Sequence, residues 1–292
     1  MPALTIGVPV YNGEKTLAHM LDALLGQTFA DFEIIISDNA STDRTADIAK
    51  DYARRDHRIR CVSQAENIGP ERNFKYVLDE AHSRFFMWSA SDDIRSPDFL
   101  QENVNFLEQH TDYVASTSPN CFEGQDQNGP QVVRFELSGS VDDRIKDFFQ
   151  YCWVSHGIFY SVIRTDVLRT CEVVGQPFLG TDWAIALYLA SRGKMHRTQA
   201  GMMVSGAHGM SNSANAWKQY RANVLSWFFP FHKVSLYTLK LTAHRPLKVR
   251  MQCLKILFEL NTRAAYDQIN SEFYPAYFRK IRPWIHKLRG KK

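Results

Sequence analysis

Strand-like and helix-like segments alternate along the first part of the chain, and this alternation restricts the fold more than any other feature of the sequence. Apolar runs predict strands at residues 4–10, 32–37, 59–63, 85–89 and 113–116. Helical periodicity predicts helices at residues 14–25, 42–54, 71–81 and 98–109. Strands that alternate with helices are typical of a mostly parallel sheet with helices on both faces. We therefore expect an α/β fold.

The composition is that of a globular protein with room for one large domain and an appendage. The chain has 292 residues, of which 45% are apolar and 23% charged. The first residues lead directly into a predicted strand, and no apolar run is long enough to span a bilayer, so we expect neither a signal peptide nor a membrane span. The five cysteines are scattered and form no C-x-x-C pair. This spacing predicts a reduced, cytoplasmic environment and argues against a zinc site.

The charge is divided unevenly along the sequence. From Trp217 onward there are 16 Lys/Arg and 3 Asp/Glu, whereas the preceding residues hold 19 and 28. Such asymmetry indicates that the C-terminal part meets something anionic, although a solvated helical surface would also explain it. Four prolines, at positions 230, 246, 275 and 283, predict that this part forms several short helices.

Polar motifs follow the predicted strands. They are VPVYNGE at residues 8–14, SDNASTD at 37–43, ENIGPERN at 66–73 and WSASDD at 88–93. Each motif alone has a plain explanation as a helix cap, a turn or a solvated loop. However, the carboxyl ends of parallel strands share one edge of a sheet, which is where open α/β sheets bind ligands. Their joint occurrence therefore indicates one functional site.

The order of these motifs resembles family 2 glycosyltransferases of the GT-A fold, which carry P-x-Y-N-x-E, then D-(N/D)-x-S-x-D, an N-x-G loop and an acidic D-x-D or D-D pair. The resemblance covers roughly residues 4–210. It implies a Rossmann-like, mostly parallel sheet flanked by helices, with a helical C-terminal extension. The implied catalytic domain is 1–213, with a donor half at about 1–118 and an acceptor half at about 119–213. A basic, aromatic-rich helical region follows at 214–292.

The resemblance also implies which residues bind a nucleotide-diphospho-sugar donor. They are Pro9, Tyr11, Asn12, Glu14, Asp38, Asn67, Gly69, Arg72, Asn73 and Asp92. Tyr11 would line the nucleoside pocket, and Asp38 would accept hydrogen bonds from the base or ribose. Arg72 would contact the base or a phosphate.

A nucleoside diphosphate leaves readily only when its charge is neutralised, and a divalent cation does this. Mn²⁺ or Mg²⁺ prefers carboxylate oxygens. By resemblance, Asp93 would ligate the metal, Asp92 would contact the ribose or the metal, and His208 would approach the metal or the diphosphate. His208 also has a purely structural alternative. Many relatives carry a further acid where Ala90 and Ser91 stand here, but two adjacent acids suffice in parts of the family.

The second half of the resemblance concerns the acceptor. Asp182 stands where the family carries an acid, often as E-D, and direct displacement needs a general base there. Alternatively, or in addition, Asp182 caps a helix predicted at 183–191. Trp153 and His156 fall where the acceptor side begins, and Trp153 would stack on a sugar ring unless it is a core aromatic.

These implications predict an inverting transfer of one sugar, from UDP by default, to the hydroxyl of a glycan or lipid-linked acceptor in bacterial-type surface glycan or polysaccharide biosynthesis. Residues 131–135 resemble the Q-x-x-R-W motif of processive synthases but precede Asp182, which favours single additions. Residues 277–292 place apolar and basic side chains at helical spacing. We therefore expect this segment either to bind the anionic inner face of the cell membrane or to pack on the domain.

Other classes of function are less compatible with the motifs. A sugar-nucleotide nucleotidyltransferase would need a G-G-x-G-x-R loop after the first strand, which the chain lacks. A non-catalytic sugar-binding or membrane-surface protein would not need the acids at 38, 92, 93 and 182. The absence of a G-x-G-x-x-G turn and of a P-loop argues against dehydrogenases and kinases. No nucleic-acid-binding motif accompanies the basic tail, so we expect no nucleic-acid partner.

Overall fold

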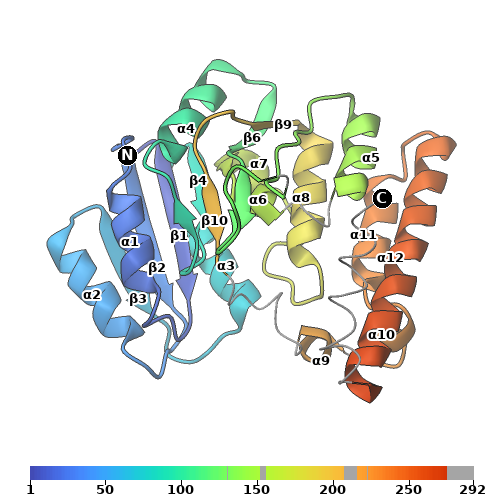
Figure 1. Ribbon diagram of the computed structural model, residues 1–292, viewed down its shortest axis with the longest axis horizontal. Coiled ribbons are helices and arrows are strands. Elements are labelled where there is room, and N and C mark those ends of the chain that lie inside the picture. The colour runs from blue at the N-terminus through green and yellow to red at the C-terminus, as the bar shows by residue number, and fades with distance from the viewer. Residues whose placement is uncertain (130, 152–155, 207–215, 222, 275–292) are drawn as a thin grey trace. The chain divides into compact units, whose positions relative to one another are not determined.

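The computed structural model describes residues 1–274 apart from residues 130, 152–155, 207–215 and 222 (Figure 1). The chain divides into two compact units. Unit 1 contains residues 1–177 and 181–209, and unit 2 contains residues 178–180 and 210–292. Each unit has its own set of packed elements.

Unit 1 is built on a seven-stranded sheet in the order β3-β2-β1-β4-β8-β6-β9. Its strands are β1 (Leu4–Val10), β2 (Phe32–Asp38), β3 (Ile59–Ser63), β4 (Phe85–Trp88), β6 (Tyr113–Thr117), β8 (Val162–Arg164) and β9 (Lys194–Arg197). β1 pairs in parallel with both β2 and β4, whereas β8 runs antiparallel to its neighbours β4 and β6. The mostly parallel sheet predicted from the alternation is therefore confirmed.

Eight helices accompany these strands in the described part of unit 1. They are α1 (Leu17–Leu25), α2 (Thr45–Arg55), α3 (Pro70–Asp79), α4 (Phe99–Gln109), α5 (Val141–Tyr151), α6 (His156–Phe159), α7 (Thr165–Arg169) and α8 (Thr181–Arg192). The first four helices begin close to their predicted positions. Residues 14–16 form a turn instead of helix, because the carbonyl of Gly13 accepts the N–H groups of Thr16 and Leu17.

Both faces of the central strand β1 are covered, which explains its uninterrupted apolar sequence. Alternate residues such as Leu4 and Ile6 join the cluster formed by the apolar sides of α1 and α4. On the other face, a Cβ added at Gly7 would lie 2.6 Å from a methyl group of Val77 on α3. Gly7 thus allows α3 to approach the sheet closely.

Unit 1 also contains a three-stranded sheet, which the sequence did not predict. It has the order β5-β10-β7, with β5 at Ile94–Arg95, β7 at Asn120–Phe122 and β10 at Met203–Ser205. β10 pairs antiparallel with β5 and parallel with β7. This pairing brings Gly206, the residue after β10, beside the acidic motif that precedes β5.

Unit 2 contains α9 (Ala216–Tyr220), α10 (Leu225–Phe228), α11 (His232–Leu241) and α12 (Leu247–Phe273). The prediction of only short helices is wrong for α12, which has 27 residues. Pro246 immediately precedes this helix, and no proline or glycine interrupts residues 247–274. α12 packs on α10 and α11 (Figure 1). Asn261 of α12 accepts the N–H of Phe231 at 2.9 Å and so fixes the start of α11.

None of the described helices, α12 included, combines the length and the apolar character that a membrane crossing requires.

Candidate active site

Three polar loops leave the same edge of the large sheet. β1 and β2 are paired from Leu4 with Phe32 to Val10 with Asp38, and β4 runs parallel to β1. Parallel strands of matched register end together, so the loops that follow them lie side by side. Three of the four polar motifs of the sequence, at residues 8–14, 37–43 and 88–93, form these loops, and the fourth, at 66–73, follows β3.

Hydrogen bonds join the loop after β1 to the loop after β2. The backbone N–H of Asn12 donates to Ser41 Oγ at 2.9 Å, and Asn12 Oδ1 accepts the N–H of Thr42 at 2.9 Å. Asn12 has a φ of 51°, a left-handed conformation that asparagine tolerates better than most residues. A carboxylate oxygen of Glu14 accepts the N–H of Arg44 at 3.2 Å. Asn12 and Glu14 therefore hold the two loops together.

Asn39 connects the loop after β2 to the N-x-G loop. Its side chain is buried, its Oδ1 accepts the N–H of Ile68 at 2.9 Å, and its Nδ2 donates to Asn67 Oδ1 at 3.0 Å. Asn67 Oδ1 also accepts the N–H of Gly69. Gly69 has a φ of 84°, which favours glycine, and Pro70 then begins α3.

Two predicted donor-binding residues lie beneath these loops. Asn73 is buried, its Nδ2 donates to the carbonyl of Ser37 at 2.9 Å, and its Oδ1 accepts the Ser37 hydroxyl at 2.6 Å. Asn73 thus anchors α3 to β2. Pro9, also buried, lies beyond Gly7, where the pairing of β1 with β4 ends, so its missing N–H leaves no gap in that ladder. Contact of either residue with a donor stays a prediction.

Three other predicted donor residues line the same edge. Tyr11 is 50% exposed, and Arg72 is exposed at the first turn of α3. Asp38 is buried at the end of β2, and its Oδ1 accepts the N–H of Ser41 at 3.2 Å. The arrangement leaves an aromatic ring and a guanidinium accessible above a fixed carboxylate.

Asp93 is the buried member of the acidic pair. Its Oδ1 accepts the N–H of Gly206 at 3.2 Å, whereas its Oδ2 is buried without a hydrogen-bond partner. Burial raises the pKa of Asp93 to about 6; the charge of Arg95 opposes this increase, and that of Asp92 adds to it. A buried carboxylate oxygen without a partner is costly, and a cation would satisfy it.

Gly206 packs directly against Asp92. A Cβ added to Gly206 would lie 2.2 Å from Asp92 Oδ2 and 2.6 Å from Asp92 Cβ. The close approach therefore needs glycine, and the same residue supplies the N–H that Asp93 accepts. Gly206, the residue after β10, forms one wall of the acidic site.

Arg95 lies behind the acidic loop. Its guanidinium is buried, donates to Ser89 Oγ at 2.7 Å and to the carbonyl of Trp88 at 3.2 Å, and lies 5.3 Å from the ring centre of Phe99. These bonds fix both ends of the loop between β4 and β5. The positive charge of Arg95 also favours the ionised form of Asp93.

The acidic pair fits a divalent cation that the donor completes. Within the described ranges, no group of three or more His, Cys, Asp or Glu side chains is arranged to hold a metal. Mg²⁺ in nucleotide sites usually takes one or two carboxylates and obtains its other ligands from substrate phosphates and water. Asp92 and Asp93 provide two carboxylates, and the unpartnered Oδ2 of Asp93 is an acceptor of the required kind.

Tyr160 links the acidic pair to Asp182. Burial raises the pKa of Tyr160 well above its usual range, and the charges of Asp93, Asp182 and Asp92 raise it further. All three carboxylates are therefore within electrostatic reach of one phenol. Asp182 is exposed in the first turn of α8. Because α8 begins at Thr181, Asp182 is the second residue of the helix and not the N-cap residue that precedes it.

Three predicted residues cannot be placed. Trp153 and His208 lie outside the described residues, and His156 belongs to α6 with a side chain that is not described. The proposed metal role of His208 and the acceptor roles of Trp153 and His156 stay predictions.

Three residues of the site were not found from the sequence: Arg95, Tyr160 and Gly206. Gly206 could have been noticed in the sequence, because it lies two positions after the apolar residues Met202, Met203 and Val204. Arg95 followed the acidic pair by two positions, but nothing in the local pattern showed that it would be buried.

The family model described as "Glycosyl transferase family 2" matches residues 5–166, which is more than half of the chain. The chain belongs to this family. The uncharacterized glycosyltransferase EpsJ of Bacillus subtilis strain 168 is 46% identical over 110 residues, which are 38% of this chain and 32% of EpsJ. Matches to the first three curated relatives, all from Bacillus subtilis, cover 48%, 33% and 32% of their lengths. The chain therefore spans about half of these relatives or less.

Solved structures support the GT-A fold. The crystal structure of S. aureus TarS 1-349 has a TM-score of 0.64 at 16% identity, and the match covers 90% of this chain and 74% of TarS. The mannosyltransferase PcManGT from Pyrobaculum calidifontis has a TM-score of 0.56 at 15% identity, covering 97% of this chain and 83% of PcManGT. At these identities the likeness shows the fold and nothing further.

Proposed function

We propose that this protein transfers one glycosyl residue from a nucleotide-diphospho-sugar to an acceptor hydroxyl, with inversion at the anomeric carbon. One observation carries the proposal: the adjacent Asp92 and Asp93 lie at the loop edge of the sheet, where Asp93 Oδ2 is buried without a hydrogen-bond partner. A pair of acids for the diphosphate and a separate exposed acid for the acceptor are what a direct displacement requires.

The donor is proposed to lie along the loops after β1, β2 and β4. Tyr11 would contact the nucleoside, Asp38 the base or ribose, and Arg72 the base or a phosphate. Asp92 and Asp93 would hold Mn²⁺ or Mg²⁺, which neutralises the charge that develops on the departing diphosphate. Because Arg95 fixes the loop that carries Asp93, and the N–H of Gly206 donates to Asp93 Oδ1, the carboxylate needs little rearrangement when the donor binds.

Asp182 is proposed as the general base that accepts the proton of the acceptor hydroxyl. Its place in the first turn of α8 suits this role, because the positive end of the helix dipole favours a carboxylate there. The resulting alkoxide-like oxygen attacks the anomeric carbon from the side opposite the diphosphate, and this gives the inverted product.

Complexes of similarly folded proteins support the choice of donor. TarS has been crystallised with UDP-GlcNAc and with UDP, and PcManGT with GDP-Man and Mn²⁺. We propose UDP as the nucleotide of this protein and a glycan or lipid-linked sugar as its acceptor. Surface polysaccharide biosynthesis at the inner face of the cell membrane is the corresponding proposed setting.

A screen of nucleotide sugars by thermal shift, with and without Mn²⁺, tests this function. A donor at about 100 times its Kd should add about 2.7 kcal/mol of stability. The increase should need Mn²⁺ and should disappear in Asp93→Ala, whose circular dichroism should remain that of the wild type. Stabilisation by the best donor that is unchanged in EDTA would contradict the metal role.

Product analysis separates transfer from related chemistry. With the best donor and a panel of glycan acceptors, mass spectrometry should show one added sugar per acceptor and release of nucleoside diphosphate. NMR of the product should show the inverted anomer. Release of pyrophosphate from a sugar phosphate and a nucleoside triphosphate would instead indicate a nucleotidyltransferase.

A further inference from the structure

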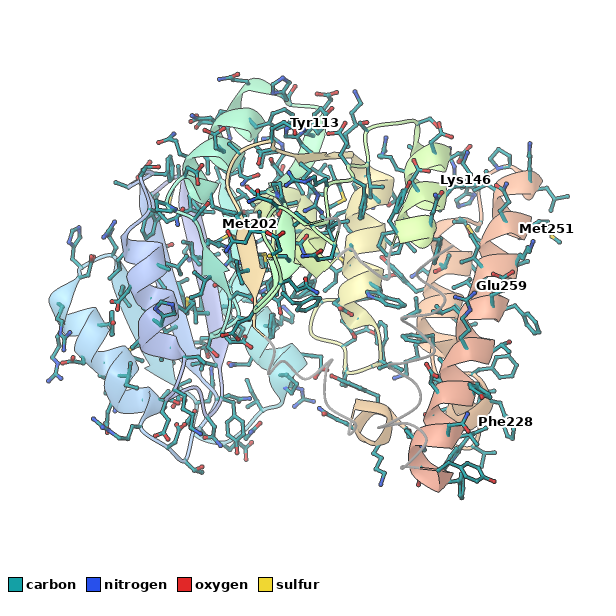
Figure 2. All side chains as sticks on the ribbon, in the orientation of Figure 1. Tyr113, Lys146, Met202, Phe228, Met251 and Glu259 are labelled. Atoms are coloured by element: carbon teal, nitrogen blue, oxygen red, sulfur yellow. The ribbon has the colours of Figure 1, made fainter. Side chains whose placement is uncertain are left out.

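The outer side of α12 carries a row of exposed apolar side chains. Leu247, Met251, Leu254 and Phe258 are exposed by 69%, 56%, 41% and 67%. They follow one another at intervals of four, three and four residues, so they share one side of the helix. Figure 2 shows Met251 projecting from α12 into open space. We call these four residues the apolar stripe.

The stripe is separate from the side that α12 uses for packing. The buried residues of α12 are Val249, Cys253, Leu257, Leu260, Asn261, Ala264 and Gln268. These positions face α10 and α11, which supply the contacts of α12 within unit 2. The stripe is therefore an additional apolar surface, and the fold of unit 2 does not require it.

Mostly basic side chains border the stripe. Lys248 and Lys255 each follow a stripe residue by one position, which places them about 100° further round the helix. Arg250 precedes Met251 and lies on the opposite border. All three are exposed, as is Glu259, which follows Phe258 on the first border, so the border as a whole is positively charged. An apolar strip bordered by Lys and Arg is the arrangement of helices that lie in the interface of an anionic bilayer.

We propose that the apolar stripe and its basic border form a docking surface for an anionic lipid bilayer, with α12 lying in the plane of the headgroups. The surface is distinct from residues 277–292, for which the sequence predicted membrane binding. Unit 2 has two further exposed apolar side chains, Phe228 at the end of α10 and Phe229 after it, which are 60% and 42% exposed.

Charge argues against two other partners for the apolar stripe, namely a second copy of the chain and the chain's own residues 275–292. A second copy of the chain in a two-fold symmetric contact would bring another unit 2, which holds 16 Lys/Arg and only 3 Asp/Glu. Residues 275–292 hold seven of these basic residues and no acid. Either partner would bring positive charge close to Lys248, Lys255 and Arg250 and would repel them. An anionic bilayer attracts them instead, with about 1 kcal/mol for each basic residue near the surface.

The test uses the full chain and vesicles, without any donor, so that it is independent of the proposed transferase activity. The wild type should co-sediment with phosphatidylcholine vesicles that contain phosphatidylglycerol. It should bind vesicles of phosphatidylcholine alone far more weakly, and high salt should weaken the binding to anionic vesicles. Leu254→Glu and Phe258→Glu should each lower the partition coefficient by about tenfold or more.

Gln252→Glu is the matched control, because Gln252 is exposed on α12 about 130° round the helix from the mid-line of the stripe, farther than Lys248 and Lys255. It should change binding far less than Leu254→Glu. Replacing Lys248 and Lys255 by Gln should reduce the salt-dependent part of the binding. Mn²⁺-dependent UDP binding, measured in parallel, should be the same in all variants if unit 1 is intact.

Three results would overturn the proposal. They are absence of binding to anionic vesicles at low salt, equal binding by Leu254→Glu, Phe258→Glu and wild type, and a stable dimer in analytical ultracentrifugation that the stripe substitutions dissociate. The second result would place any membrane contact elsewhere in the chain. The third would make the stripe an interface between copies.

Discussion

The burial of the Asp93 carboxyl group lowers the stability of the protein. Burial raises its pKa from 3.8 to about 6, so the folded state binds a proton between these values that the unfolded state has already lost. Stability therefore falls as the pH rises through this window. Above it, the ionised carboxylate costs about 3 kcal/mol, because each tenfold increase in proton affinity corresponds to about 1.4 kcal/mol.

Asp93→Asn should consequently stabilise the metal-free protein near neutral pH. We expect its Tm in EDTA at pH 7.5 to exceed that of the wild type by several degrees, since about 1 kcal/mol corresponds to a few degrees in a protein of this size. Near pH 4 the difference should vanish, because the wild-type carboxyl is then protonated. Differential scanning calorimetry at both values measures this. A lower Tm for the variant at pH 7.5 would show that the burial of Asp93 carries no such cost.

Asp182→Asn separates a catalytic from a structural role at α8. As general base, Asp182 should contribute about 10²-fold or more to kcat, whereas donor affinity should be unchanged. Asp182→Glu should recover part of the rate, because it restores a carboxylate. Steady-state kinetics with the best donor and acceptor, combined with thermal melts, measure both. A variant with a lowered Tm and a normal kcat would show that the residue only favours the helix start.

The hydrogen bonds between the loop after β2 and the N-x-G loop lead to a different prediction. Asn39→Ala removes the acceptor of the Ile68 N–H and the donor to Asn67, and each lost hydrogen bond costs about 1 kcal/mol. The N-x-G loop should then be held less firmly, so the KM for the donor should rise while kcat changes little. Gln101→Ala is the control, since it removes an exposed hydrogen bond to Asn105 on α4. A stability loss without a change in KM would place the N-x-G loop outside the donor site.

The long strands and helices were predictable, whereas the short ones were not. β1 and β3 have the predicted bounds, because buried strands of a parallel sheet are continuous apolar runs. β5 has two residues and β10 has three, which is too few for any periodicity to emerge. The length of α12 was missed because the prolines were counted over the whole tail, although Pro246 only marks the start of the helix.

The candidate site was predictable where its residues belong to a local motif. Asp92 and Asp93 were found because adjacent acids after a strand are visible in the sequence. Gly206 lies 113 positions from Asp93, and only the pairing of β10 with β5 brings the two together. Arg95 was missed for a related reason: a basic residue in a polar loop gives no sign that tertiary packing will bury it.

The division of the chain into an acidic and a basic part follows its division into two units. Residues up to 209 carry 19 Lys/Arg and 28 Asp/Glu, and the remaining residues carry the 16 and 3 counted above. The negative charge belongs to the unit proposed to bind a cation and its nucleotide, and the positive charge to the unit proposed to bind a bilayer.

Hydrogen–deuterium exchange should therefore separate the two ligands. UDP with Mn²⁺ should slow exchange in the loops after β1, β2 and β4 and leave α12 unchanged. Anionic vesicles should slow exchange in α12 and leave those loops unchanged. Protection of α12 by UDP and Mn²⁺ would show that the nucleotide contacts or orders both units, which is contrary to this assignment.

Gly69 and Gly206 should both resist replacement in a saturation mutagenesis screen for function, but for different physical reasons. Gly69 has a φ of 84° and a ψ of 157°, although a Cβ there would meet nothing within 4 Å. These angles lie outside the left-handed helical region that asparagine and aspartate tolerate, so every other residue should be strained at position 69 by its own backbone. At position 206 even alanine should be lost, because its methyl group would collide with Asp92 Cβ, which cannot move without its backbone. Descendants of this chain should accordingly keep glycine at both positions, through backbone strain at 69 and through a collision at 206.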